Sequence, residues 1–159
     1  MTRMRPAVLL LLLACAHPSG LKKELSPLAW MEGDWSCRIT SLDSGAIEEG
    51  KLQFFPELGG AWLGGKLVIP GRGPGPLFEL VSHLGLDRDG RWTRVDVDVS
   101  GQVKLLRADA AGDSTLWQPA VDGDFRERID RHGGAGLQCM IEGREKGEWV
   151  KQIRFDCSR

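Results

Sequence analysis

Turn-forming residues recur at short intervals along the chain, and this spacing is the strongest constraint on its fold. The clusters include Asp87-Arg88-Asp89-Gly90, Asp122-Gly123 and His132-Gly133-Gly134. Asp-Gly pairs supply the positive φ that tight hairpins require. After Met31, no stretch of helical period is longer than one or two turns. The spacing therefore predicts an all-β domain built from short antiparallel strands, either a sandwich or an up-and-down barrel.

Between the turns, apolar and polar residues alternate as in half-buried strands, first in Trp35-Ser36-Cys37-Arg38-Ile39. A single helical turn precedes them, which we expect Ser26 to cap, with Pro27 in its first position. Closing the sheet into an up-and-down barrel would remove its exposed edges. The ten expected strands lie at roughly 35–39, 46–55, 61–69, 77–84, 91–99, 102–108, 114–119, 124–130, 136–142 and 149–157.

The N-terminus has the layout of a secretory signal. Arg3 and Arg5 lead into an apolar run from Ala7 to Ala14, which is too short to cross a bilayer. Leu12-Leu13-Ala14-Cys15 resembles the lipobox of bacterial lipoproteins, in which the cysteine becomes the diacylated N-terminus. The alternative is ordinary secretion, because Ala14-Cys15-Ala16 also fits an A-x-A cleavage pattern.

We favour the lipoprotein, because a cysteine at the end of the apolar run needs an explanation. Two or more acyl chains give lasting membrane attachment. The expected organisation is a signal peptide over 1–14, a tether over 15–26 and a barrel over 27–159. The resemblance, with Ala16 after Cys15, implies the outer membrane of the bacterial envelope. The alternative is a secreted or periplasmic soluble protein.

Charge and cysteine content narrow the possible partners. The 159 residues carry a formal net charge of −1 and no basic runs, which argues against nucleic-acid binding. If Cys15 is lipidated, three cysteines remain, and an oxidising compartment permits one disulfide among them. Cys37 and Cys157 lie on the first and last expected strands, which become neighbours if the sheet closes. The alternative is three separate buried thiols.

Short motifs in the chain resemble the lipocalin and calycin group. Gly33-Asp34-Trp35 resembles its G-x-W motif, which implies that Trp35 fills the closed end and stacks with an arginine from the last strand. Arg154 is the first candidate for this arginine, and Arg159 is the second. Met31 to Trp35, Gly59 to Trp62 and Gly85 to Gly90 are also similar to an uncharacterised bacterial family of calycin-like barrels. The resemblance implies a container and names no contents.

Three charged residues share one face of the expected strand 91–99. Arg94, Asp96 and Asp98 alternate with valines, and two interpretations follow. In the first, the charged residues line the barrel interior, where they orient a ligand or act as a general base. In the second, which we favour, the valines face inward and the charges face water.

The remaining candidates for chemistry are isolated. His83 could ligate a haem by analogy with related barrels, but no second residue supports it, so we expect no cofactor and no metal site. Trp62 and Trp92 are candidates to line a cavity, although core packing is the default role of large aromatic residues. The chain has no G-x-S-x-G, C-x-x-C or H-E-x-x-H motif, so enzyme activity is the less favoured expectation.

We therefore expect an envelope lipoprotein, attached to the membrane through its N-terminal lipid, whose barrel binds a small apolar ligand. The first alternative is a structural or assembly partner in the envelope with a filled barrel, whose protein partner the sequence does not indicate. The second is a barrel enzyme that uses Asp96, Asp98 or His83 as acid or base.

Overall fold

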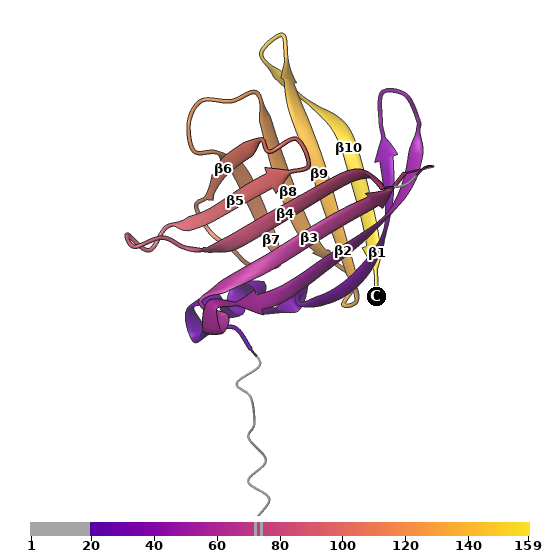
Figure 1. The fold of residues 1–159 in the computed structure, drawn as a ribbon. Coiled ribbons are helices and arrows are strands. Elements are labelled where there is room, and N and C mark those ends of the chain that lie inside the picture. The colour runs from indigo at the N-terminus through magenta and orange to yellow at the C-terminus, as the bar shows by residue number, and fades with distance from the viewer. Residues whose placement is uncertain (1–19, 72, 74) are drawn as a thin grey trace, which may run out of the picture.

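The computed structural model describes residues 20–71, 73 and 75–159, which form an antiparallel barrel (Figure 1). The predicted signal peptide and Cys15 lie outside the described residues. The strands are β1 (Gly33–Ser41), β2 (Ile47–Glu57), β3 (Trp62–Pro70), β4 (Pro76–Leu86), β5 (Trp92–Asp98), β6 (Val103–Ala108), β7 (Ser114–Pro119), β8 (Phe125–His132), β9 (Gly136–Glu145) and β10 (Glu148–Ser158).

Each strand pairs with its neighbours in chain order, and the first strand pairs with the last. The order β1-β10-β9-β8-β7-β6-β5-β4-β3-β2 is closed, with Ile39 of β1 opposite Phe155 of β10. The predicted fold, an all-β up-and-down barrel of about ten strands with one short N-terminal helical segment, is therefore confirmed. Closure leaves no long unpaired strand edge among the described residues.

The N-terminal helical segment is longer than predicted. It is a 3-10 helix, η1 (Lys23–Met31), and its N-cap is Lys22, without a side-chain cap. Leu25, Leu28 and Met31 are buried, and their spacing of three places them on one side of a 3-10 helix. Ser26 therefore lies inside the helix and does not cap it. Residues 23–26, which we expected in the tether, belong to this packed element.

The helix defines a covered end of the barrel. The chain enters there, where Lys22 donates its backbone N–H to the carbonyl of Gly60 at 2.9 Å, in the short helix η2 (Leu58–Gly60). The hairpins that join β1 to β2 and β9 to β10 lie at the opposite end (Figure 1). Because successive strands run in opposite directions, the β3–β4, β5–β6 and β7–β8 connections also lie at this opposite end, which we call the open end.

The inward face of β5 is the opposite of the one we favoured. Arg94 and Asp96 point into the barrel and are 5% and 3% exposed, whereas Val95 and Val97 point outward and are half-buried. The interpretation with inward valines is therefore wrong. Burying charge is costly, and the structure meets that cost by pairing the charges with each other.

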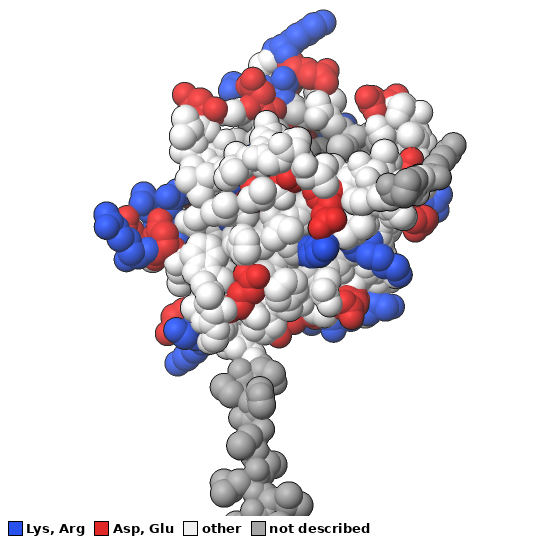
Figure 2. Space-filling view, viewed as in Figure 1, with Lys and Arg blue, Asp and Glu red and all other residues white. Residues whose placement is uncertain are grey.

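Charged side chains on the outer surface are most frequent at the hairpins. Figure 2 shows most of them around the margin of the face that carries β3 and β4, and fewer within it. The ion pair between Lys66 and Glu79, at 2.9 Å, belongs to the outward face of these two strands. The charged side chains of the outer surface face solvent, whereas Arg94 and Asp96 face the barrel interior.

Candidate functional site

A cavity of about 510 Å³ occupies the barrel interior and continues to the open end. Most of its wall consists of leucine, isoleucine and phenylalanine side chains from seven strands, of which Leu52, Leu67, Leu80, Phe125, Ile141 and Phe155 are examples. Gln102 and Lys104 line its mouth and are exposed. The alternation of apolar residues along each strand places one side chain in every two on this wall.

A charged cluster interrupts the apolar wall, and Arg94 is at its centre. Arg94 Nε donates a hydrogen bond to Asp96 Oδ1 at 2.7 Å, two residues along the same face of β5. Arg94 Nη1 lies 2.9 Å from Oε1 of Glu127, a residue of β8 that also lines the cavity. This second contact is an ion pair without hydrogen-bond alignment, so Nη1 is buried without an aligned acceptor among the described residues.

A thiol completes the cluster. Cys139 of β9 is buried, and its Sγ donates to Glu127 Oε1 at 3.1 Å. Burial and the neighbouring Glu127 carboxylate raise the pKa of this thiol well above its ordinary value. Burial alone would lower the pKa of Arg94, but the carboxylates of Glu127 and Asp96 outweigh burial and raise it. Arg94 therefore stays a cation and Cys139 stays a neutral thiol.

Sequence reasoning missed Glu127 and Cys139. Glu127 stands between Phe125 and Ile129 with a spacing of two, so the alternation on β8 placed it on an apolar face. A carboxylate in such a row needs a partner if that face is buried. This signal could have identified Glu127 as the partner of Arg94.

The structure brings only part of the predicted lining together. Arg94, Asp96 and Asp98 line the cavity. His83 points outward and shares a 2.6 Å contact from its Nδ1 to Glu57 Oε2, so it does not reach the interior, and the haem alternative loses its proposed ligand. Trp62 lies on the outer face against Gly85, and Trp92 packs against the core without lining the cavity.

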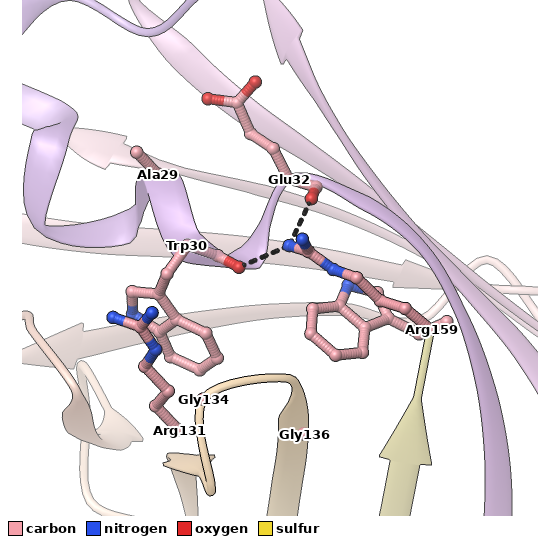
Figure 3. Close-up of a pocket in the computed structure, with 8 residues that line it drawn as sticks. Ala29, Trp30, Glu32, Arg131, Gly134, Gly136 and Arg159 are labelled. Carbon is pink, nitrogen blue, oxygen red and sulfur yellow. Dashed lines mark hydrogen bonds between the residues drawn. The ribbon is translucent and has the colours of Figure 1, made fainter.

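A smaller pocket of about 290 Å³ lies at the covered end, between η1 and the β8–β9 hairpin. Arg159 lines this pocket, with its guanidinium 4.6 Å from the ring centre of Trp35. It also donates from Nη2 to the carbonyls of Trp30 and Glu32, each at 2.8 Å (Figure 3). Trp35 Nε1 in turn donates to the carbonyl of Met31 at 2.8 Å.

The choice of Arg154 as the arginine that stacks on Trp35 is wrong. Arg154 is half-buried on β10 and pairs with Asp156 at 2.8 Å, on the outward side of the strand. The inward positions of β10 are Phe155 and Cys157, so position 154 cannot face Trp35. Arg159 can, because it follows the end of β10 and turns back over the covered end of the barrel.

The cysteines on the first and last strands are joined. Cys37 and Cys157 stand directly opposite each other on β1 and β10 and form a disulfide across 120 residues of sequence. Both side chains point inward and are buried, near the covered end. The third thiol, Cys139, lies on the neighbouring strand and is free. The disulfide thus fixes the seam where the sheet closes.

The comparison with solved structures agrees with this architecture. The chain is similar to the crystal structure of Rv2717c from M. tuberculosis, with a TM-score of 0.59 and 17% sequence identity. The match covers 87% of this chain and 98% of that chain. The shared feature is the fold. No protein-family model matches the chain, and no curated protein matches it significantly.

The arrangement fits binding better than acid–base catalysis. Each buried carboxylate is held by Arg94, and His83 lies outside the cavity, so the three residues proposed for a barrel enzyme do not converge. The described part of the chain holds no group of three His, Cys, Asp or Glu side chains suited to a metal ion. Within those same residues, no helix has the length and apolar character to span a membrane.

Proposed function

We propose that the protein binds a small, largely apolar molecule in its barrel and holds it without altering it. The cavity of about 510 Å³ carries this proposal. Small-molecule sites usually enclose about 300–1,000 Å³, with mostly apolar walls and few polar groups. The barrel interior combines these properties, because hydrocarbon side chains surround one compact charged cluster.

The shape of the barrel supports one route for the ligand. Leu25, Leu28 and Met31 of η1 are buried at the covered end, and Arg159 ties that helix to the end of β10. The mouth lies at the other end, beside Gln102 and Lys104. Each methylene group that moves from water to the wall contributes about 0.8 kcal/mol. A chain of several methylene groups is therefore enough for binding.

We also propose that the protein is a lipoprotein of the bacterial envelope, anchored in the outer membrane through a lipid on Cys15. The lipobox-like Leu12-Leu13-Ala14-Cys15 supports this part of the proposal. The disulfide between Cys37 and Cys157 is consistent with an oxidising compartment. A filled barrel that serves only as an assembly partner is less well supported, because its interior would hold no cavity of this size.

Filling the cavity tests the ligand-binding proposal. Leu80 lines the cavity, whereas Val81, the next residue of β4, points outward. We expect the purified protein to take up the neutral dye Nile red and decan-1-ol to displace it. Leu80→Trp should weaken binding of both at least about tenfold by occupying the space that they need. The matched control Val81→Trp should bind both normally.

Circular dichroism of each variant establishes that the barrel is intact. Failure of the unaltered protein to bind either compound would contradict the proposal. Equal binding by the two tryptophan variants would contradict it as well, since the ligand would then lie outside the cavity.

A further inference from the structure

The charges that line the cavity do not balance. Three carboxylates, Asp96, Asp98 and Glu127, face two cations, Arg94 and Lys104. Asp98 and Lys104 lie near the mouth, where Lys104 is exposed and solvent screens both charges. In the interior, Asp96 and Glu127 share the single cation Arg94. The buried cluster therefore carries one negative charge in excess.

Each of the two carboxylates of the cluster accepts hydrogen bonds through only one of its oxygens. Asp96 Oδ1 accepts from Arg94 Nε, and Glu127 Oε1 contacts Arg94 Nη1 and Cys139 Sγ. Among the described residues, Asp96 Oδ2 and Glu127 Oε2 accept no hydrogen bond, and neither oxygen is sealed off from the cavity. Arg94 Nη1 is sealed off, whereas Arg94 Nη2, which also makes no hydrogen bond among the described residues, is not, so it is the net negative charge of the cluster that favours a cation.

These free oxygens favour a particular ligand chemistry. An uncompensated charge in an apolar interior is costly, and a bound cation offsets that cost. An ammonium group carries positive charge and three N–H donors, which match acceptor oxygens that have no partner. A ligand carboxylate would add negative charge beside two carboxylates. An apolar wall with one negatively charged cluster thus fits a ligand that has a hydrocarbon body and a basic nitrogen at one end.

We infer that the ligand is an amphipathic amine whose protonated nitrogen lies against Asp96 and Glu127 while its hydrocarbon part contacts the apolar wall. This inference rests on the proposed function, since it names the ligand class of the same cavity. Asp96 comes from β5 and Glu127 from β8, so the ammonium group joins two strands that are not neighbours in the barrel.

Three ligands of equal chain length separate the contribution of the headgroup to binding from that of the hydrocarbon chain. Decylamine, decan-1-ol and decanoate are compared at neutral pH, below their aggregation limits, by displacement of Nile red from the purified protein. We expect decylamine to bind at least about tenfold more tightly than decan-1-ol, because its charge is neutralised at the cluster. Decanoate should bind more weakly than decan-1-ol.

Variants then locate the headgroup. Asp96→Asn and Glu127→Gln should each weaken decylamine binding about tenfold or more while leaving decan-1-ol within about twofold. Glu79→Gln is the matched control, because that carboxylate lies on the outward face of β4 and pairs with Lys66. Unchanged decan-1-ol binding also shows that a variant still forms the cavity.

The outcomes separate the two proposals. If decan-1-ol binds and decylamine binds no better, or if decanoate binds most tightly, the amine inference is wrong and the cavity proposal stands. If none of the three binds, both are wrong. A variant that also loses decan-1-ol is unfolded or collapsed, and the comparison of the three ligands on the unaltered protein then decides alone.

Discussion

At the scale of single residues, the structure shows how position on a strand decides what an arginine does. Arg154 and Arg159 are five residues apart, yet only Arg159 covers Trp35 and bonds to the end of η1. Arg154 forms a half-exposed ion pair with Asp156. Exposed pairs of this kind contribute about 0–1 kcal/mol. The two residues therefore differ in what their removal should cost.

We expect Arg159→Ala to lower the free energy of unfolding by about 1–2 kcal/mol, since it removes a cation–π contact and two hydrogen bonds. Arg154→Ala, the control from the same segment, should change it by about 0.5 kcal/mol or less. Urea denaturation measured by circular dichroism gives both values. Equal effects of the two substitutions would show that Arg159 does not hold the covered end closed.

The residue scale is also where sequence reasoning reached its limit. Alternation on β5 established that Arg94, Asp96 and Asp98 share a face, because strand geometry has a period of two. Alternation cannot tell which face is inside. That depended on Glu127, a partner on β8 that is far away in the sequence. Arg159 was only the second candidate for the arginine on Trp35 for a similar reason, since no strand pattern describes a residue that lies beyond the end of β10.

At the scale of elements, the sequence predicted the strands more accurately than it predicted the roles of single residues. Asp-Gly and Gly-Gly turns separate the strands, and ten strands form close to the predicted ranges. Local signals sufficed because each hairpin pairs neighbours in the chain. The start of η1 was misjudged because Ser26 and Pro27 resemble a helix start. The buried Leu25 extends the helix further back, to Lys23.

The one pairing between elements distant in sequence is that of β1 with β10, and the Cys37–Cys157 disulfide joins them. We expect Cys37→Ala/Cys157→Ala to lower the free energy of unfolding by up to about 5 kcal/mol, because a bond across 120 residues restricts the unfolded chain. Urea denaturation with and without a reductant measures this effect.

Cys139→Ser is the control, because it keeps the disulfide and leaves a hydroxyl that can donate to Glu127. Its effect should be much smaller. An unaltered denaturation midpoint of the original protein in strong reductant would show that the cross-link does not stabilise the closed sheet.

At the scale of the whole molecule, the two ends of the barrel have different surroundings. The described chain begins at Gly20, close to Gly60 at the covered end. The five positions from Cys15 to Gly20 span at most about 18 Å. If Cys15 carries the lipid, the covered end is held near the bilayer and the mouth is directed away from it. Leu77, Val99 and Val121 are exposed around that mouth.

We expect the protein to fractionate with membranes and to incorporate a labelled fatty acid when produced in a bacterium that processes lipoproteins. Cys15→Ser should abolish the label and release the protein, because acyl chains supply the attachment. Cys139→Ser, a change to a buried thiol, should leave both intact. A soluble, unlabelled original protein would contradict the anchor and favour cleavage as an ordinary secreted protein.

The position of Cys139 affects how the chain matures. If Cys15 carries the lipid, the unfolded chain has three thiols and can join any two of them, and two of the three pairings are incompatible with this barrel. Once β8, β9 and β10 pair, Cys139 is enclosed beside Glu127 and rarely ionises, and only the thiolate attacks disulfides. The completed fold thereby makes its spare sulfur inert, and the correct bond between the first and last strands is protected from reshuffling.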